Sequence, residues 1–397
     1  MFGLIRRFRL KQRLHDLYFY KLEGWYIRFI RHFTISHPLK NVIIIESHDD
    51  FDCNGGAFYD YLLAEHYNDT YKIIWLLKKP APHKLPKNVK GYPIDRPNLM
   101  KSYYRCVAKI LTADDFVTPK VRDDQKEYYL THGGITFKNV KGLLVVPDHV
   151  DYVLSSSANY DPYVCQNYSI PYPNAKMLHF GYPRDDCLYT DTPDEFWKIS
   201  NVTYDKVILW MPTFRKLAGT DRNDSTMVQP LGIPLIENLE TYNQLNLFLK
   251  KHRIFLILKI HPCQDLSDLK VTDQSNIRVV TGKTMKELGL NLSYLMKSAD
   301  ALISDYSSSA YQYLLLDRPL AFVLSDLKEY KLGFSVKNYT DFLPGNYIYK
   351  FSDMITFLEQ ITLGNDQHHQ ERLDLRKFLY EHMDGSACER LVRHMNL

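Results

Sequence analysis

The sequence predicts an α/β protein built from two doubly wound domains, each with its own parallel sheet. The chain has 397 residues, which is the length of two ordinary domains. Short segments rich in Val, Ile and Leu alternate with segments of helical periodicity, which is the pattern of βαβ units. This alternation starts twice, on either side of a polar stretch near 190–205 that we interpret as the linker.

The N-terminal domain is assigned to residues 37–195. Its first strand is predicted at 42–45, where four β-branched apolar residues precede a polar turn. A helical segment follows at 57–66. Further strands are predicted at 72–77, 108–111, 128–130, 143–146, 152–154 and 177–180. Because helical segments separate them, these strands are expected to run parallel.

The C-terminal domain is assigned to residues 205–364. Its strands are predicted at 207–210, 254–260, 277–280, 301–303 and 320–324. The run at 254–260 is apolar and is interrupted only by Lys259. After 303, a polar turn and a short helix precede Pro319, which ends the helix. Residues 365–397 are predicted to be helical and to pack back across both domains.

Residues 1–36 form a basic segment of helical periodicity. Residues 1–32 contain eight Lys and Arg against two acids, interleaved with apolar and aromatic residues. Such a basic amphipathic helix can lie on an anionic membrane surface. The alternative is a helix packed on the domain with its basic face in water. No apolar run approaches the roughly 18 residues that span a bilayer, so we expect a peripheral protein at the cytoplasmic face of the cell membrane.

The composition argues against several classes of site. The six cysteines are scattered and none forms a C-x-x-C pair, which disfavours a disulfide framework and a structural zinc site. No G-x-G-x-x-G, Walker lysine or H-E-x-x-H pattern is present. Asp50 and Asp52 form a D-x-D pattern, a weak signal for metal, and we expect no required metal or cofactor. The net charge of +4 gives no indication of a nucleic-acid partner.

Polar residues directly follow five of the predicted strands, at the edge where parallel sheets place their ligands. They include His132 and His261, which can accept a proton near neutral pH. Arg184 and Arg215 can form paired hydrogen bonds to phosphate oxygens, and Lys138 adds a point charge. This combination is typical of a site for a polyanionic substrate. The segments are 131–138, 181–185, 212–215, 261–262 and 305–308.

Two further features of these segments favour phosphate. Ser307 and Ser308 stand where a helix is predicted to begin, and a helix start offers free N–H groups and a positive dipole end. Gly133 and Gly134 allow the backbone to approach a ligand closely. The structural alternatives are a serine cap on the helix, a capped histidine before Pro262, an interdomain ion pair for the first arginine and a solvated loop for the second.

In their order along the chain, these motifs resemble those of the CDP-glycerol glycerophosphotransferase family, which builds wall teichoic acids and related capsule polymers. The resemblance extends over about residues 40–395. Each motif is short, and their common order carries the resemblance. The motifs are the histidine–glycine motif ending in lysine (131–138), Gly-x-Pro-Arg-x-Asp (181–186), Pro-Thr-Phe-Arg (212–215), His-Pro (261–262), Asp-Tyr-Ser-Ser with Leu-Leu-Leu-Asp-x-Pro (305–319) and the closing segment 384–390.

The resemblance implies a GT-B fold, in which two Rossmann-like domains face a central cleft, and a CDP-glycerol or CDP-ribitol donor. His132 would be the general base on the acceptor side, and His261 would be the second catalytic histidine, in the donor domain. The donor and its phosphates would be held by Arg215, Thr213, Ser307, Ser308, Asp305, Lys138 and Arg184. The acceptor side would include Gly133, Gly134 and Asp185.

The implied reaction transfers glycerol phosphate or ribitol phosphate to a hydroxyl of a lipid-linked saccharide and releases CMP, in teichoic acid or capsule synthesis. The chain is close to the bare catalytic length, which favours a priming enzyme over a polymerase. The rival hypotheses are a GT-B glycosyltransferase that uses a nucleotide sugar and a non-catalytic membrane scaffold. Thr131, Gly134 and Ile135 stand where family members commonly have Trp and Thr-Pro, so the acceptor side is expected to differ. Whether the protein forms a homo-oligomer is left open.

Overall fold

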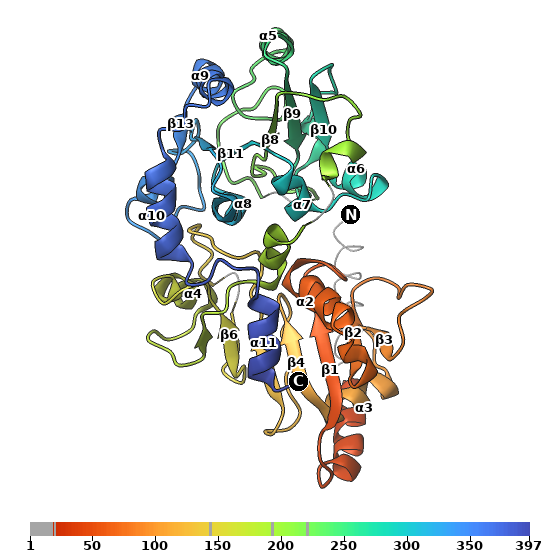
Figure 1. The fold of residues 1–397 in the computed structure, drawn as a ribbon. Helices are drawn as coiled ribbons and strands as arrows, with labels where there is room; N and C mark the ends of the chain where they lie inside the picture. The colour runs from red at the N-terminus through yellow and green to blue at the C-terminus, as the bar shows by residue number, and fades with distance from the viewer. Residues whose placement is uncertain (1–18, 20, 143–144, 192–193, 220–221) are drawn as a thin grey trace, which may run out of the picture.

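Two parallel sheets form the centre of the protein, one in each half of the chain (Figure 1). The structure is a computed structural model that describes residues 19, 21–142, 145–191, 194–219 and 222–397. In Figure 1 the N-terminal sheet lies below and the C-terminal sheet above. This arrangement confirms the predicted α/β fold with two parallel-sheet domains.

The N-terminal sheet has seven strands in the order β3-β2-β1-β4-β5-β6-β7. β1 pairs in parallel with β2 on one side and with β4 on the other, so the winding direction reverses there. Ligands bind at such a switch point, at the carboxyl ends of the strands. The strands are β1 (Lys40–Glu46), β2 (Lys72–Leu77), β3 (Val89–Pro93), β4 (Ala108–Ala113), β5 (Lys126–Tyr129), β6 (Tyr152–Leu154) and β7 (Met177–Leu178).

The C-terminal sheet repeats this plan with six strands in the order β10-β9-β8-β11-β12-β13. Here β8 lies between β9 and β11, and the winding reverses at β8. The strands are β8 (Lys206–Trp210), β9 (Ile254–Lys259), β10 (Ile277–Val280), β11 (Ala301–Ser304), β12 (Leu320–Val323) and β13 (Asn346–Ile348).

Helices connect many of the strands, because a parallel pair requires a crossover. Several begin at a side-chain cap: Asn98, Asn238 and Thr281 each accept a hydrogen bond from the N–H group three residues on. The helices are α2 (Cys53–Ala64), α3 (Leu99–Val107), α4 (Asp161–Tyr168), α5 (Leu239–Lys251), α6 (Gly282–Glu287), α7 (Leu292–Lys297), α8 (Ser308–Tyr313), α9 (Phe351–Thr362), α10 (His369–Leu379) and α11 (Ala387–Met395).

The buried strand β9 has one core on each face. Leu256 and Leu258 pack in a cluster with residues of α5 and α9. Ile257 belongs to a different cluster, which continues into the N-terminal domain. Because side chains two residues apart share a face of a strand, this alternation determines which side chains at the end of β9 are turned toward the other domain.

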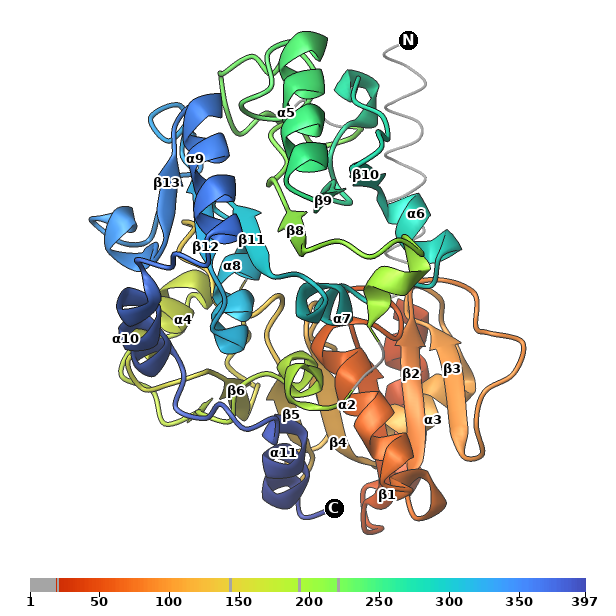
Figure 2. The ribbon, with the colours of Figure 1, turned by 45° about the horizontal axis from the view of Figure 1, so that its top comes forward.

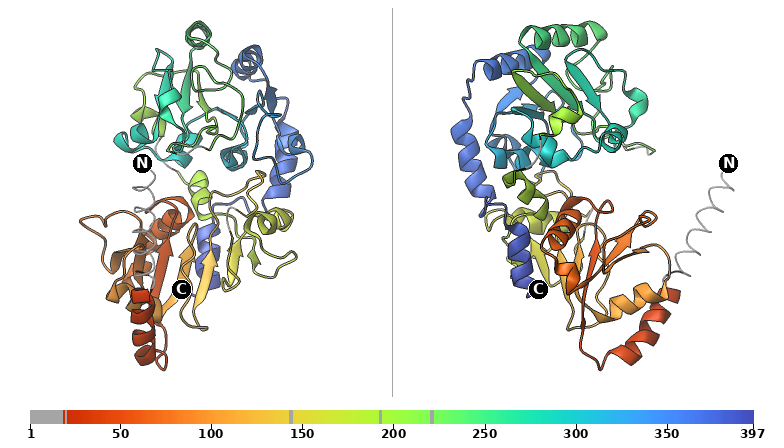
Figure 3. Two further views of the ribbon diagram at one scale, coloured as in Figure 1. Left: turned by 180° about the vertical axis from the view of Figure 1, so that it is seen from behind. Right: turned by 45° about the vertical axis from the view of Figure 1, so that its right-hand side comes forward.

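The C-terminus of the chain returns to the N-terminal domain (Figures 2 and 3). α10 lies beside the C-terminal domain, and α11 packs against the N-terminal one. There the Tyr128 hydroxyl lies 3.0 Å from Nδ1 of His394, and Lys109 donates to the carbonyl of Asn396 at 3.2 Å. The two domains are therefore joined by the C-terminal segment as well as by the linker.

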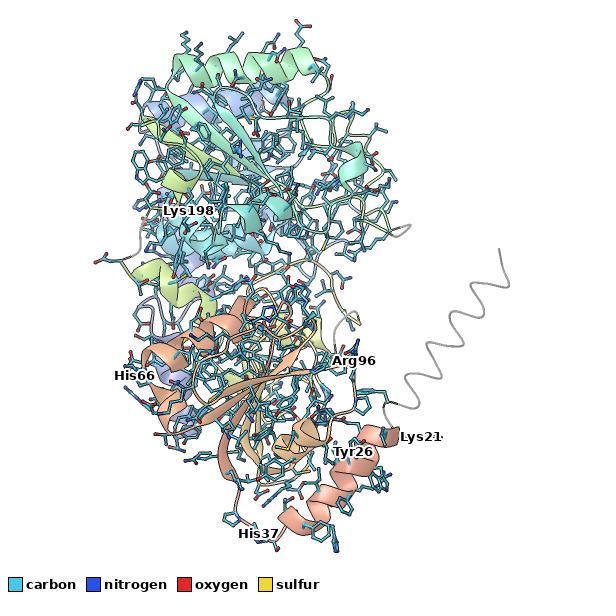
Figure 4. The ribbon with its side chains drawn as sticks, turned by 90° about the vertical axis from the view of Figure 1, so that its right-hand side faces the viewer. Lys21, Tyr26, His37, His66, Arg96 and Lys198 are labelled. Atoms are coloured by element: carbon cyan, nitrogen blue, oxygen red, sulfur yellow. The ribbon has the colours of Figure 1, made fainter. Side chains whose placement is uncertain are left out.

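Residues 21–34 form a helix at the edge of the N-terminal domain that is remote from the C-terminal domain (Figure 4, where Lys21 and Tyr26 mark it). Glu23, which belongs to this helix, is buried against α3 and lies 3.6 Å from both Lys101 and Arg105. Of the predicted basic segment 1–36, residues 1–18 and 20 lie outside the described residues. Within the described ranges, no helix has the length and apolar character that crossing a bilayer requires.

Three details differ from the sequence predictions. Residues 145–146 form no strand, so the strand predicted at 143–146 is wrong there, and 143–144 lie outside the described residues. The edge strands β3 and β13 were not predicted, because they are short and partly exposed and lack an apolar run. The helix predicted at 57–66 begins earlier, at Cys53, where the Asp52 side chain accepts a hydrogen bond from the Cys53 N–H.

Candidate active site

The loop after β5 reaches from the N-terminal domain to the C-terminal domain. Its backbone is left-handed at Thr131, Gly133 and Gly134, with φ values of 61°, 78° and 76°. Glycine adopts this conformation without strain, whereas a threonine there is uncommon. At the far end of the loop, Lys138 forms an antiparallel bridge with Phe334 of the C-terminal domain. We call residues 131–138 the histidine loop.

His132 lies half-buried in the histidine loop. Its ring packs against the ring of His48, with 4.1 Å between the centroids. Its Nδ1 is buried and has no hydrogen-bond partner among the described residues. Burial, followed by the positive charges of His48 and Arg184, lowers the pKa of His132 to about 4. The imidazole is therefore neutral at physiological pH, which is the form that accepts a proton.

His48, which follows β1, was not predicted as a site residue. Its Nδ1 lies 3.5 Å from Oδ2 of Asp115, and that oxygen lies 2.7 Å from Nζ of Lys78. The hydrogen bond with Asp115 raises the pKa of His48. Lys78 also lies 2.9 Å from Oε1 of Glu46. The ends of β1, β2 and β4 thus carry a series of alternating acids and bases that leads to His132.

Arg184 and Asp185 support the histidine loop from the N-terminal domain. Arg184 donates a hydrogen bond to the carbonyl of Gly133, and its Nε lies 3.6 Å from Oδ1 of Asp185. A Cβ on Gly134 would lie 2.9 Å from Nη2 of Arg184, so a larger residue there would displace the guanidinium. Asp185 is buried, and burial raises its pKa to about 7. Arg184 therefore contacts the loop directly, and Asp185 lies beside Arg184.

Arg215 is buried in a network of acids in the C-terminal domain. Its Nε and Nη2 donate to the two carboxylate oxygens of Asp326 at 2.6 and 3.0 Å. Its Nη1 donates to the Thr213 carbonyl at 2.8 Å and lies 3.0 Å from Oδ2 of Asp305, which also accepts the Thr213 N–H. Most of the N–H donors of Arg215 are therefore engaged within the protein, and the alternative of a solvated arginine is wrong.

Ser307 and Ser308 lie at the start of α8, after the carboxyl end of β11. Ser307 caps the helix, since its Oγ accepts a hydrogen bond from the Ser309 N–H at 3.3 Å. A Cβ on Gly133 would lie 3.9 Å from Oγ of Ser308. The histidine loop of one domain therefore faces the start of α8 in the other.

His261 follows β9 and is half-buried. Its Nδ1 accepts a hydrogen bond from the Cys263 N–H at 3.1 Å, which assigns the proton of the neutral ring to Nε2. Burial, followed by the charges of Lys259 and Lys138, lowers the pKa of His261 to about 3. Because Lys138 comes from the histidine loop, its effect on His261 locates side chains of both domains in one electrostatic environment.

The carboxylates of the D-x-D pattern are engaged as backbone caps. The two oxygens of Asp50 accept hydrogen bonds from the N–H groups of Lys78 and Lys79 at 2.9 and 2.8 Å. Asp52 caps α2. These bonds give both carboxylates a structural role in the N-terminal domain.

Cys53, Asp114 and His132 have potential ligand atoms that all lie within 4.8 Å of one another. Burial raises the pKa of the Cys53 thiol to about 12. The carboxylate of Asp114 already accepts hydrogen bonds from Ser47 and from two backbone N–H groups. Since metal binding uses the thiolate, this group is poorly matched to a divalent metal.

Three residues of this region were missed by sequence reasoning: His48, Lys259 and Asp326. His48 and Asp326 each follow a predicted strand by a few residues, so the rule that found the other segments applied to them too. Lys259 interrupts an apolar strand, and a charge at such a position signals a buried ion with a function or a partner.

The chain matches the family model described as CDP-Glycerol:Poly(glycerophosphate) glycerophosphotransferase over residues 29–397. The teichoic acid glycerol-phosphate primase of Bacillus subtilis (strain 168) is 24% identical over 369 residues, which cover 86% of this chain and 88% of the primase. The teichoic acid poly(ribitol-phosphate) polymerase of Bacillus spizizenii is 27% identical over 386 residues. That match covers 89% of this chain but 56% of the polymerase, so the chain spans little more than half of that relative.

A solved structure of the wall teichoic acid polymerase TagF superimposes with a TM-score of 0.73 at 18% identity, covering 99% of this chain and 96% of that one. At this identity the likeness shows the fold alone. The family match covers nearly the whole chain and includes every motif on which the resemblance rests. The chain therefore belongs to the CDP-glycerol:poly(glycerophosphate) glycerophosphotransferase family.

Proposed function

We propose that the protein transfers glycerol phosphate or ribitol phosphate from a CDP-alditol to a hydroxyl of a lipid-linked saccharide and releases CMP. The observation that carries this proposal is the meeting of strand ends from both domains. Gly133, next to His132, faces Ser308, and Lys138 acts on His261. A neutral histidine on one side and cationic and hydroxyl groups on the other are the parts that phosphoryl transfer needs.

In the proposed reaction the acceptor hydroxyl attacks the β-phosphorus of the donor. A new P–O bond forms, the bond from the β-phosphorus to the bridging oxygen breaks, and CMP leaves with that oxygen. His132 accepts the hydroxyl proton and passes it to solvent. The negative charge of the bound donor raises the pKa of His132 from its low value in the free protein, which makes it a better base during the reaction.

Charge builds on the phosphoryl oxygens and on the leaving phosphate during the transfer. Lys138, His261 and the Ser308 hydroxyl can stabilise that charge without a metal. For Arg215 we propose a positioning role, since its pairing with Asp326 orders the loop that follows β8.

We infer that the protein primes a polymer rather than extends one. The match to the glycerol-phosphate primase over 88% of its length supports this inference. The choice between glycerol and ribitol is left to experiment, because both kinds of relative match the chain.

We also propose that residues 1–36 hold the protein against the anionic membrane surface that carries the acceptor. In the described part, Trp25 stacks on Phe29 and Phe29 meets Phe33 edge to face, and the three rings are 54%, 51% and 59% exposed. Arg28 and Arg31 are exposed beside them. Exposed aromatic rings next to basic side chains suit a membrane interface.

The decisive experiment incubates the protein separately with CDP-glycerol, CDP-ribitol and UDP-sugars, and measures release of CMP or UDP. Mass spectrometry of the products from a lipid-linked disaccharide then counts the units added. Release of CMP with one or a few units added supports the proposal, and long chains would indicate a polymerase. Release of UDP would replace it with glycosyl transfer. Vesicle binding without release of any nucleotide would indicate a scaffold.

A further inference from the structure

Lys259, the last residue of β9, is only 6% exposed although it carries an ammonium group. Every other residue of this strand is apolar. Within the described part of the chain, its Nζ has no hydrogen bond and no ion pair, and Asp52 is the one acid that raises its pKa. Burial lowers that pKa to about 8. An isolated buried charge destabilises the folded state, so the position of Lys259 requires an explanation.

Other buried cations of the protein have partners of their own. Arg215 and Arg372 each donate two hydrogen bonds to an aspartate. Lys101 donates to three backbone carbonyls and lies 3.6 Å from Glu23. Lys259 differs from these residues because its side chain is buried and, among the described residues, its ammonium group has no hydrogen bond and no ion pair.

The alternation along β9 turns Lys259 toward the N-terminal domain. Leu256 and Leu258 face the cluster formed with α5 and α9, whereas Ile257 faces the cluster that continues into the N-terminal domain. Lys259 and His261 are two and four residues beyond Ile257, so the alternation carries them onto the same side.

A second lysine lies near the same histidine. Lys138 of the histidine loop is half-buried and has no ion pair within the described ranges, and burial lowers its pKa to about 8. The charges of Lys259 and Lys138 both lower the pKa of His261. Asp305 acts on Lys138 and Asp52 on Lys259 through space, but neither acid is paired with its lysine.

We propose that Lys259 and Lys138, one from each domain, bind the pyrophosphate group of the nucleotide donor beside His261. Lys259 is almost fully buried and Lys138 is half-buried, and neither ammonium group has an ion pair among the described residues. Two such groups are complementary to a ligand group that carries at least two negative charges. Arg215 cannot take this role without giving up Asp326. This inference rests on the proposed function, since it names the charges that hold that donor.

The test compares Lys259→Met, Lys259→Arg and, as a matched control, Lys251→Met at an exposed position of the same domain. Without ligand, Lys259→Met is expected to raise the melting temperature, because methionine fills the space without a buried charge. Inorganic pyrophosphate is expected to raise the melting temperature of the wild type and of Lys259→Arg, and to have little effect on Lys259→Met. By calorimetry, Lys259→Met should bind CDP-glycerol about 10- to 100-fold more weakly, and Lys251→Met should match the wild type.

The outcomes separate this inference from the proposed function. Equal affinity of the wild type and Lys259→Met for pyrophosphate and CDP-glycerol would overturn the inference and leave the function standing. A wild type that binds pyrophosphate through Lys259 but not CDP-glycerol would overturn the donor assignment and keep the anion site. A lower melting temperature of ligand-free Lys259→Met would reveal a structural partner of Lys259 and would also overturn the inference.

Discussion

The strand ends of the two domains differ in how their charges are compensated. In the N-terminal domain, charged groups at the ends of β1, β2 and β4 form a connected series of ion pairs. Glu46, Lys78, Asp115 and His48 each lie within 3.5 Å of the next, and His48 packs against His132. Each of these four side chains has an ion-pair partner, whereas Nδ1 of His132 is buried and has no hydrogen-bond partner among the described residues.

In the C-terminal domain, one cation is fully paired and another is not. Arg215 is held by Asp326 and Asp305 in a buried network. Lys259, on the neighbouring strand β9, is buried and forms no ion pair among the described residues. Arg215, which is fully paired, therefore stabilises the domain structure. Lys259 remains able to bind an anionic ligand.

The difference corresponds to two chemical tasks. A proton acceptor has to be neutral and fixed in orientation, and a connected series of partners provides both. An anion site requires charge that the protein has not already neutralised, because a paired cation would have to exchange one anion for another. The comparison therefore predicts that substitutions in the two regions change different measurable quantities.

The largest expected effect comes from the two histidines. His132→Ala is expected to lower the rate of CMP release by about two to four powers of ten, because the acceptor hydroxyl loses its base. His261→Ala is expected to reduce the rate strongly as well, because it removes a group beside the donor phosphates. Circular dichroism should show that both variants fold, and His83→Ala, at an exposed position, is the control. Near-normal turnover in both variants would refute the assigned roles.

The next largest effect is on stability. Arg215→Met leaves Asp326 and Asp305 buried without their cation, so we expect the free energy of unfolding to fall by about 3–5 kcal/mol. Urea denaturation followed by tryptophan fluorescence measures this change. The double variant Arg215→Met/Asp326→Leu should recover part of the loss. If Arg215→Met keeps wild-type stability and only binds the donor more weakly, Arg215 is a ligand-binding group. The proposed contrast between a structural Arg215 and a ligand-binding Lys259 would then be wrong.

The strands and the polar residues that follow them could be predicted from the sequence, but the ion pairs between those residues could not. Apolar runs such as those of β1 and β9 marked the strands, and the polar residues after them marked the edge of each sheet where the site residues gather. The partner of Arg215 lies 111 residues away in the chain, and no local pattern indicates that Asp326 comes within 2.6 Å of it. A phosphate-binding arginine and a scaffold arginine therefore look alike in the sequence.

The same limit applies to His48 and Lys259. His48 gains its role from contacts with Asp115 and with the ring of His132, which come from other strand ends. Lys259 differs from other buried cations in that its ammonium group has no ion pair among the described residues. This can be recognised only in the folded structure, where its neighbours in space are known. Edge strands β3 and β13 escaped prediction for a related reason, since pairing with a neighbour rather than an apolar run defines them.

A smaller effect is expected at His48. The pKa of His132 is lowered by burial and by the charges of His48, Arg184 and Lys78, while Asp115 acts in the opposite direction. His48→Phe keeps an aromatic ring against His132 and removes the charge, so the pKa of His132 should rise from about 4. Because the neutral form is the active one, the acid limb of the rate of CMP release should move to higher pH. The rate near neutral pH or above should change little.

A titration of the histidine ring signals by NMR checks this shift without any substrate, with His132→Ala to assign the signal. Asp115→Asn is the companion variant. Losing that carboxylate should lower the pKa of His48 toward or below its usual value, since the hydrogen bond with Asp115 is the main cause of its rise. An acid limb that stays in place in His48→Phe would mean that burial alone sets the pKa of His132.

The smallest effect on turnover is expected at the aromatic face of the helix at 21–34. Replacing Trp25, Phe29 and Phe33 by serine should weaken binding to phosphatidylglycerol vesicles several-fold, because these rings are exposed and remote from the domain interface. Co-sedimentation measures the loss. Donor affinity should not change, whereas the KM for a lipid-linked acceptor should rise. Lys259→Met should show the opposite pattern, with weaker donor binding and normal vesicle binding, so the two variants together separate recognition of the acceptor from recognition of the donor.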